Sequence, residues 1–144
     1  MPRVVHIEWT YPKSWESALS SLEASGLGIY QIYRVFGSSD TLLYVGLVKS
    51  DRRDFYTRMN EHQKEWLHEK RGALFLTFGH VRGFRGCPMT PQLLEEVEGA
   101  IIFATQPPEN TMKKSSYSRR EDLIVKSIGY RGDVPKQIDT TDHG

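Results

Sequence analysis

Residues 28–46 read GIYQIYRVFGSSDTLLYVG, and this stretch decides the fold that the sequence predicts. Aromatic and β-branched residues are frequent in both arms, and a cluster of Gly, Ser and Asp at positions 37–40 separates them. Two arms of this composition around such a cluster are typical of a β-hairpin. The sequence therefore predicts an antiparallel pair of strands, with Tyr30 in the first strand and Tyr44 in the second.

The faces on which Tyr30 and Tyr44 lie depend on the register of this hairpin. A regular hairpin closed by the four residues 37–40 pairs position 36 with 41 and position 33 with 44. Because side chains alternate between the two faces of a strand, that register puts the two phenols on opposite faces. For both to face one site, the loop must have an odd number of residues or one strand must contain a β-bulge. We predict such a shift of register.

Hydrophobic periodicity, helix caps and prolines predict the elements around the hairpin. They are a strand at 3–9, a helix from Ser14 to about Ala24, a helix at about 52–68, a strand at 72–81, a helix from Pro91 to about Thr105 that ends before Pro107 and Pro108, and a strand at 122–128. The strand at 72–81 is too apolar to be an exposed edge. We expect an α+β fold in which the hairpin and this third strand form a small, mostly antiparallel central sheet flanked by helices.

With 144 residues, the chain has the length of one domain with a single core. We expect residues 28–128 to form this domain. Residues 1–27 are predicted to add a strand and a helix that pack on its core. Residues 129–144 contain Gly, Pro and many polar residues and are predicted to be a loose C-terminal tail.

Composition is that of an ordinary globular protein, with 38% hydrophobic and 26% charged residues. The formal net charge of +1 argues against a protein that coats nucleic acid by bulk charge. No apolar run approaches the roughly 18 residues that span a membrane, and the first six residues lack the pattern of a signal peptide. One cysteine, Cys87, excludes an internal disulfide and a multi-cysteine metal site. These features predict a cytoplasmic protein.

The predicted helix at 52–68 has a basic pair at the edge of its apolar face. Arg58 and His62 are four residues apart and lie beside Met59 and Trp66 by helical spacing. A pair with this spacing is commonly a feature of a solvated surface. An arginine drawn toward an apolar face needs an anionic partner, however, and a phosphate would serve. Both interpretations are open.

Glu98 lies within the apolar stripe of the helix predicted from Pro91, one turn from Leu94 and one turn from Ile102. Glu96 falls on the opposite, polar side. A carboxylate on a buried face is unfavourable unless it is paired or bound to a metal ion. A salt bridge to a nearby arginine and a metal site are therefore both open for Glu98.

The order of these residues resembles the GIY-YIG nuclease family. Members combine a two-tyrosine hairpin with an arginine on the next helix, a glutamate on a later helix and an asparagine just beyond it; the matching residues are Tyr30, Tyr44, Arg58, Glu98 and Asn110. His62 matches a histidine that many members carry one turn after the arginine. Lys49 resembles a basic residue that some members place shortly after the second half of the motif. The resemblance spans residues 28–110.

Two features depart from the family pattern. Thirteen residues, 31 to 43, separate the two tyrosines, so the hairpin is longer than usual. The chain also has no obvious separate DNA-binding domain such as homing members carry. Target recognition is then expected from the loop 82–89, from the basic loop 113–120 or from another chain.

The resemblance implies metal-dependent hydrolysis of a DNA phosphodiester. Glu98 would be the single protein carboxylate on a divalent metal ion, with Mg²⁺ expected first and Mn²⁺ as an alternative. Arg58 would bind the scissile phosphate, and Tyr30, with Tyr44 beside it, would orient or deprotonate the attacking water. A phenol with its ordinary pKa of about 10 acts as a base only if cations lower that pKa. The other implied site residues are His62, for proton transfer or phosphate binding, and Lys49, Asn110, Lys113 and Lys114, for substrate binding.

Three functions are open at this point. The first is this endonuclease, with DNA as its partner, and with a homodimer or a partner protein as options for target recognition. The second is a protein of the same fold that binds nucleic acid without cutting it. The third is an unrelated metal hydrolase built on His62, His68 and His80, although their spacing fits no helical pair of ligands.

Overall fold

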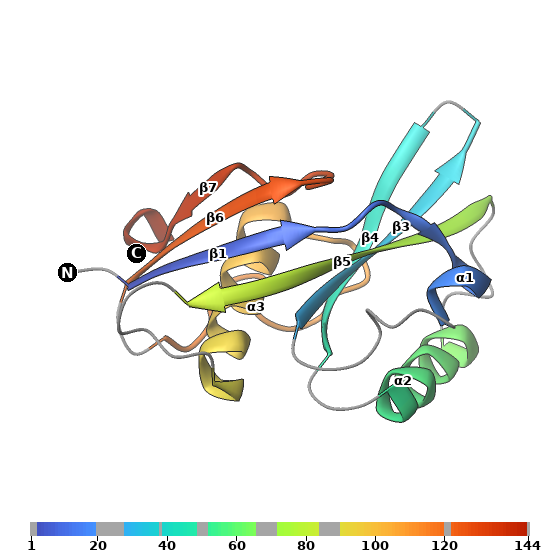
Figure 1. Cartoon of the computed structure of the whole chain (residues 1–144), viewed down its shortest axis with the longest axis horizontal. Coiled ribbons are helices and arrows are strands. Elements are labelled where there is room, and N and C mark those ends of the chain that lie inside the picture. The colour runs from blue at the N-terminus through green and yellow to red at the C-terminus, as the bar shows by residue number, and fades with distance from the viewer. Residues whose placement is uncertain are drawn as a thin grey trace.

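The structure, a computed structural model, describes residues 3–19, 28–37, 39–48, 52–65, 72–83, 90–119 and 122–143. The α+β class is confirmed, with helices packed against one sheet (Figure 1). The elements are β1 (Arg3–Trp9), β2 (Lys13–Ser14), α1 (Trp15–Leu19), β3 (Gly28–Phe36), β4 (Ser39–Val48), α2 (Arg52–Glu65), β5 (Ala73–Gly83), α3 (Pro91–Thr105), β6 (Leu123–Gly129), β7 (Gln137–Asp139) and a 3₁₀ helix (Thr140–His143). No helix within these ranges has both the length and the apolar character needed to cross a membrane.

The sheet is larger than the sequence predicted. Its seven strands follow the order β4-β3-β5-β1-β6-β7, with β2 paired to β5 beside this path. The strand pairs in the described part of the chain are antiparallel, except for the parallel pair of β1 and β6. Figure 1 shows β3 and β4 crossing β1 and β6 steeply, so the sheet is curled. The expected sheet, made of the hairpin and one further strand, was therefore too small.

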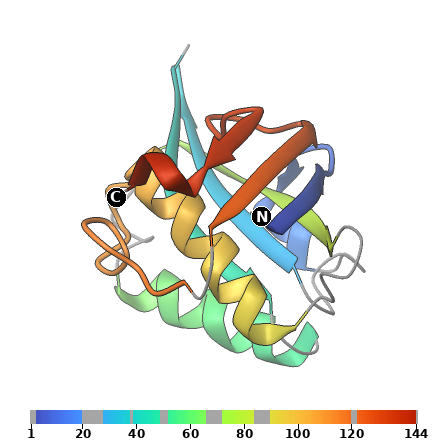
Figure 2. The same ribbon diagram turned by 90° about the vertical axis from the view of Figure 1, so that its left-hand side faces the viewer.

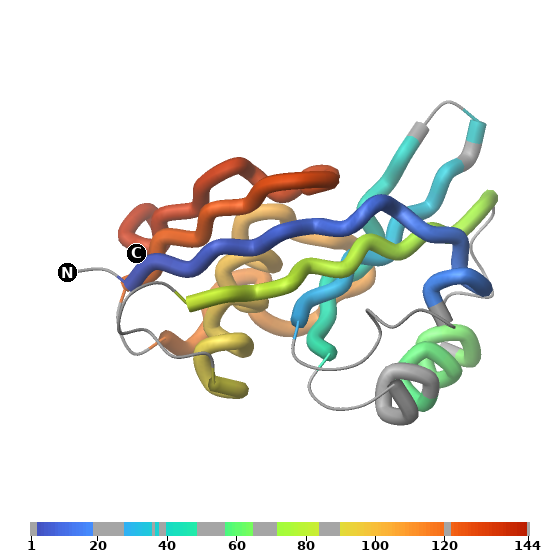
Figure 3. Tube along the Cα trace, viewed as in Figure 1, coloured from blue at the N-terminus to red at the C-terminus, as the bar shows by residue number. Residues whose placement is uncertain are grey.

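β1 is an interior strand, although the sequence predicted an extension packed on the core. It pairs with β5 on one side and with β6 on the other (Figure 3). Val5, Ile7 and Trp9 are buried, whereas His6 and Glu8 are exposed. This alternation predicted the strand correctly. It could not predict the neighbours of the strand, because both lie far along the chain.

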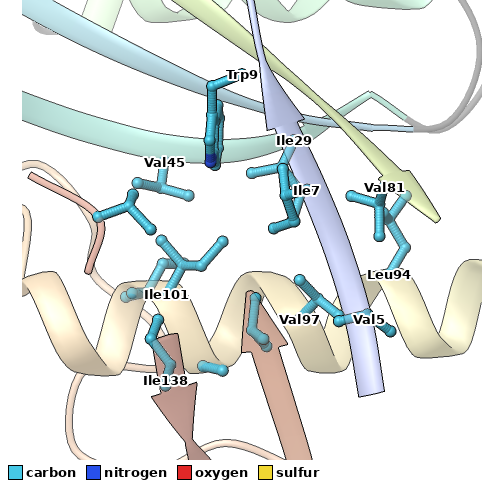
Figure 4. Packing of buried hydrophobic residues seen from close by; sticks show 14 of the residues in the cluster. Val5, Ile7, Trp9, Ile29, Val45, Val81, Leu94, Val97, Ile101 and Ile138 are labelled. Carbon is cyan, nitrogen blue, oxygen red and sulfur yellow. The ribbon is translucent and has the colours of Figure 1, made fainter. Parts of the chain in front are cut away.

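The prediction of a loose tail after residue 128 is wrong. β7 pairs with β6, and Val134 and Ile138 belong to the main core (Figure 4). Thr140 is buried as well, and its hydroxyl accepts a hydrogen bond of 2.7 Å from the Leu123 amide. Two apolar side chains in a polar stretch were too few to predict an element, yet both are used to fill the core.

Two apolar cores lie on opposite faces of the sheet. The larger one is formed with α3, which runs across one face (Figures 2 and 4). In the other core, Tyr30 and Phe78 pack with Ala18 of α1 and Met59 of α2. Neighbouring residues of β3 serve different cores, since Ile29 belongs to the first and Tyr30 to the second.

α3 begins as predicted, but the side chain of Glu96, which the sequence placed on the polar side of the helix, does not face solvent. The Thr90 hydroxyl accepts a hydrogen bond of 3.1 Å from the Leu93 amide, which caps the helix before Pro91. The placement of Glu96 on a polar side was wrong, because Glu96 is buried. Arg3 of β1 donates two hydrogen bonds to its carboxylate, at 2.9 and 3.0 Å. Helical periodicity could not reveal this cation, which comes from the other end of the chain.

Truncation of Ile138 tests whether the C-terminal segment is part of the core. Ile138→Ala should lower the free energy of unfolding by about 2–4 kcal/mol, because a buried isoleucine loses its contacts and leaves a cavity. Gln137→Ala, at the exposed neighbouring position, should change it by less than about 0.5 kcal/mol. Urea unfolding followed by circular dichroism measures both values. Equal unfolding midpoints for the two variants would contradict the packing of β7.

Candidate active site

One extra residue in β4 brings Tyr30 and Tyr44 to the same face of the sheet. The pairing is regular from the turn as far as Leu42, and the next pair joins Ile32 to Tyr44, so Leu43 is an extra residue. The predicted shift of register is confirmed. Without this bulge, Tyr44 would face the side of the sheet that α3 covers. With it, the centroids of the two phenol rings are 6.1 Å apart.

Gly46 provides the space in which the Tyr30 phenol crosses β4. The two residues are paired across β3 and β4, and β4 is the last strand of the sheet on this side. A Cβ atom at position 46 would overlap Cζ and Oη of Tyr30. Glycine therefore allows the phenol to extend toward the edge of the sheet.

α2 places a guanidinium and an imidazole beside the phenols. Arg58 Nη2 donates a hydrogen bond of 3.3 Å to Tyr44 Oη. His62 Nε2 lies 3.2 Å from Tyr30 Oη, and the His62 ring centroid is 4.5 Å from that of Tyr44. Arg58 is exposed, whereas His62 is buried. Their spacing of one helical turn thus puts the charged group at the solvent and the imidazole beneath it.

Burial sets the protonation states of Tyr30 and His62. It raises the pKa of Tyr30 well above 10, the Coulomb interaction with Tyr44 raises that pKa further, and Arg58 lowers it without outweighing burial. Burial also lowers the pKa of His62 to about 4, with the charge of Arg58 as the second cause. At neutral pH, Tyr30 therefore keeps its proton and His62 is uncharged. We assign the proton between them to Tyr30, whose hydroxyl then donates to Nε2 of the neutral imidazole.

Glu98 supplies a carboxylate that is paired with Lys113. Lys113 Nζ lies 2.6 Å from Glu98 Oε1, so the ion pair that the sequence left open is present, with a lysine in place of an arginine. Burial raises the pKa of Glu98, while the hydrogen bond and charge of Lys113 and then the charge of Arg58 lower it. Glu98 is buried, with 11% of its side chain exposed, whereas the Lys113 side chain is 24% exposed, so the pair reaches solvent mainly through the lysine. The charge of Glu98 also raises the pKa of Tyr30, as the smallest of the causes that act on that pKa.

The segment after α3 is fixed along the edge strand β4. The Glu109 amide donates a hydrogen bond of 3.0 Å to the carbonyl of the bulged residue Leu43. The buried Asn110 side chain accepts from the Val45 amide and donates to the Val45 carbonyl, both at 2.9 Å. Asn110 thus holds this segment against β4 as a further strand would. The contact with substrate that was predicted for Asn110 stays a prediction.

The remaining predicted site residues have no contact with Tyr30, Tyr44 or Arg58 among the described interactions, or they lie outside the described residues. Lys114 is half-buried, and its carbonyl accepts a hydrogen bond of 2.6 Å from Gln106 Nε2. Lys49, His68 and residues 84–89 of the predicted recognition loop lie outside the described residues.

The histidines do not form a metal site in the described part of the chain. His62 is on α2 and is buried, whereas His80 is on β5 and is exposed. Within the described ranges, no three His, Cys, Asp or Glu side chains gather in a way that could hold a metal ion. The hydrolase built on histidine ligands therefore gains no support from these residues.

Tyr117, which the sequence analysis missed, anchors the loop that contains Lys113. Its ring lies against α3 at Gly99, where a Cβ atom would be 2.7 Å from Cδ2 of the ring. Its hydroxyl oxygen is 2.6 Å from Nδ1 of His143. The signal that was available is the glycine next to Glu98 inside a helix, since such a glycine commonly has a packing reason.

Comparisons of the chain with models of known protein families, with curated proteins and with solved structures found no match. The geometry of the site is therefore the basis for assigning a function. The site combines two phenols, a guanidinium, a neutral imidazole and a carboxylate with its ammonium partner, from β3, β4, α2, α3 and the loop after α3. Such a set can bind a phosphate and transfer a proton.

Substitution of Gly46 tests the path of the Tyr30 side chain. Gly46→Ala should lower the free energy of unfolding by about 1–3 kcal/mol, because the added methyl group overlaps the phenol. In a Tyr30→Leu background, whose side chain lacks the overlapping atoms, the same substitution should be less destabilising. Urea unfolding of the four proteins measures the coupling. An equal effect of Gly46→Ala in both backgrounds would contradict the contact.

The low pKa of His62 predicts a pH dependence of stability. As the pH falls from 6.5 toward 4, the unfolded chain binds a proton on His62 that the folded protein does not bind, so the free energy of unfolding should decrease. Above this range the contribution is constant. His62→Gln should remove this slope. The difference in unfolding free energy between wild type and variant, measured at each pH, separates the contribution of His62 from that of other titrating groups. A difference in unfolding free energy that does not change between pH 7 and pH 4 would show that His62 titrates normally.

Proposed function

We propose that this protein is a metal-dependent endonuclease of the GIY-YIG type that hydrolyses phosphodiester bonds in DNA. The proposal rests on the convergence of polar residues that are far apart in the sequence. Tyr30, Tyr44, Arg58 and His62 are in contact with one another, and the charge of Glu98 acts on Tyr30 and on Arg58. The resemblance to the family implies a common site for these five residues, and the contacts among the first four support it.

Arg58 has the position expected of a phosphate ligand. Tyr44 holds one nitrogen of its guanidinium, and the residue is exposed. Because arginine presents five donors in a rigid plane, the remaining donors can bind phosphate oxygens. Arg58 also lowers the pKa of both Tyr30 and Glu98, so its charge acts on both groups.

Tyr30 and His62 form a route for the proton of the attacking water. Tyr30 Oη donates its hydrogen to His62 Nε2 and also has a hydrogen bond with Arg58, so one of its two lone pairs is left to accept from a water molecule. As the water oxygen attacks phosphorus, the bond from phosphorus to the leaving oxygen breaks, a proton of the water passes to Tyr30 Oη, and the original Tyr30 proton passes to His62, which becomes imidazolium. The leaving oxygen takes up a proton from solvent, and His62 later releases its proton to solvent. No phenolate forms beforehand, so the raised pKa of Tyr30 does not prevent the reaction.

Glu98 is the residue that would hold the divalent ion. Mg²⁺ is commonly bound by one or two carboxylates together with water molecules and substrate phosphates. A single, mostly buried carboxylate that interacts with the charge of a phosphate-binding arginine fits this mode of binding. When bound, the ion would neutralise charge on the phosphate and on the leaving oxygen. Lys113 opposes the effect of burial and so favours the ionised form of Glu98.

One observation favours the second function, binding of nucleic acid without cleavage. Lys113 already donates to Glu98 Oε1 at 2.6 Å, so the carboxylate has a cation within the protein. A buried carboxylate in a protein that never binds a metal ion would need such a partner. The two functions therefore predict different roles for Glu98 and Tyr30. A nuclease needs both residues for cleavage, whereas a protein that only binds nucleic acid needs them only for stability.

Nicking of supercoiled plasmid in the presence of Mg²⁺ or Mn²⁺ tests the proposal. The wild-type protein should convert supercoiled DNA to the nicked form. Glu98→Gln and Tyr30→Phe should each reduce the rate by about 100-fold or more, because each removes a group that acts in the reaction. His62→Gln should reduce it by a similar factor.

Tyr33→Phe is the matched control for Tyr30→Phe. It makes the same chemical change on the same strand, but Tyr33 faces the core under α3. Its rate should stay close to that of wild type. Tight DNA binding by wild-type protein without any nicking would contradict the nuclease and support the second function, as would equal rates for all five proteins.

A further inference from the structure

Three of the four large apolar side chains that are exposed on the described part of the chain gather at one end of the sheet. They are Tyr11, Ile128 and Tyr130, which are 67%, 61% and 52% exposed. Tyr11 and Tyr130 pack edge to face, with ring centroids 4.9 Å apart. The Tyr130 amide is bonded to the Trp9 carbonyl, which fixes the pair at the end of β1. A gathered apolar patch of this kind indicates a binding surface, whereas single exposed apolar residues do not.

Basic side chains line an open groove beside this patch. Lys126, Arg131 and Lys136 are among its lining residues, which include Ile128 and no carboxylate. Lys126 and Lys136 are exposed. Arg131 is held in place by a hydrogen bond of 2.8 Å from Nη1 to the Val134 carbonyl. The groove therefore offers positive charge without an acidic neighbour in its lining.

A line of basic side chains continues from the groove across the sheet. Arg82 of β5, His6 of β1 and Lys126 of β6 occupy successive paired positions, and all three are exposed. Figure 1 shows these strands side by side, with α3 behind them. Since neighbouring strands are about 4.8 Å apart, the line is about 10 Å long. Glu8 lies in the adjacent row, opposite Ile128, so the basic side chains form a line and not a broad field.

We propose that this surface, which we call the strand-binding surface, binds a single strand of nucleic acid. It consists of Tyr11, Tyr130, Lys126, Arg131 and Lys136. Cations arranged along a line match the phosphates of a backbone. Exposed aromatic rings stack on bases, whose faces are accessible in an unpaired strand. The surface adds a binding site to the proposed nuclease. The inference depends on the proposed function in one respect, which is that the bound strand is DNA.

The strand-binding surface is joined to the strand that contains Tyr30. Gln31 Nε2 donates a hydrogen bond of 3.1 Å to the Arg131 carbonyl. Tyr33 Oη accepts a hydrogen bond of 2.8 Å from the Asp133 amide. The segment that follows β6 is therefore held against β3, on the face opposite to Tyr30. A single-stranded tail bound there would keep the adjoining duplex near the site and so contribute to target recognition.

Fluorescence anisotropy with labelled DNA, in a Glu98→Gln background that does not cut, tests this inference. A duplex with a single-stranded tail should bind about tenfold more tightly than a blunt duplex of the same sequence. Tyr130→Ala should reduce the affinity for the tailed duplex about tenfold and so remove its advantage. Lys126→Glu should also weaken binding and should lower the slope of log affinity against log salt concentration by about 1.

Two matched controls change equivalent residues elsewhere. Lys64→Glu makes the same change of charge on an exposed lysine of α2, and Met112→Ala removes the fourth exposed apolar side chain. Both should leave the affinity for tailed DNA within about twofold of the parent protein. Equal losses in the controls, or equal affinity for tailed and blunt DNA, would overturn the inference.

The outcomes also separate this inference from the proposed function. Nicking by the wild-type protein without a preference for the tail would overturn the strand-binding surface and leave the nuclease standing. A preference for the tail without nicking would do the reverse. If Tyr130→Ala changed the sedimentation coefficient but not the binding of DNA, the surface would be an interface between two copies of the chain, and the inference would be wrong.

Discussion

Side chains alternate along a β-strand, so a hairpin of uniform register that is closed by an even number of residues, as here between Phe36 and Ser39, cannot present Tyr30 and Tyr44 to the same side. The extra residue Leu43 removes this obstacle by shifting the register between the turn and Tyr44. A bulged residue loses ladder hydrogen bonds, and here the Glu109 amide binds the Leu43 carbonyl from outside the sheet. The loop after α3 therefore stabilises the register of the hairpin. The same loop also contains Lys113, so the position of the phenols and the environment of Glu98 depend on one segment.

In this site the two buried groups next to each other are uncharged, and the charged groups are exposed to solvent or paired. Tyr30 and His62 are buried and uncharged at neutral pH, since burial moves their pKa values in opposite directions. The charged Arg58 lies above them at the solvent, and Glu98 is balanced by Lys113. This arrangement can attract an anion without leaving a buried charge unpaired in the free protein. For the hydrolysis proposed above, it favours transfer of the water's proton to a neutral pair of groups over transfer to a phenolate.

Features that depend on neighbouring residues, or on the alternation of side chains between the two faces of a strand, could be predicted from the sequence. The hairpin, the need for a shifted register and the helix that begins after Thr90 are of this kind, and all three are confirmed. The sequence failed where a partner comes from a distant part of the chain. Glu96 was placed at the surface because its partner Arg3 is on β1, and Ile138 was assigned to a loose tail because the core it fills is formed by other segments. The pairing of Glu98 was foreseen as an option, but the choice of Lys113 over an arginine depends on the path of the loop after α3.

A crystal structure of Glu98→Gln protein bound to a short DNA duplex tests most directly whether these groups form one phosphate site. We predict a phosphate within hydrogen-bonding distance of both Arg58 and Tyr30 Oη, with His62 on the other side of the phenol. A phosphate bound away from these residues, or a regular hairpin with Tyr44 turned toward α3, would contradict the assignment.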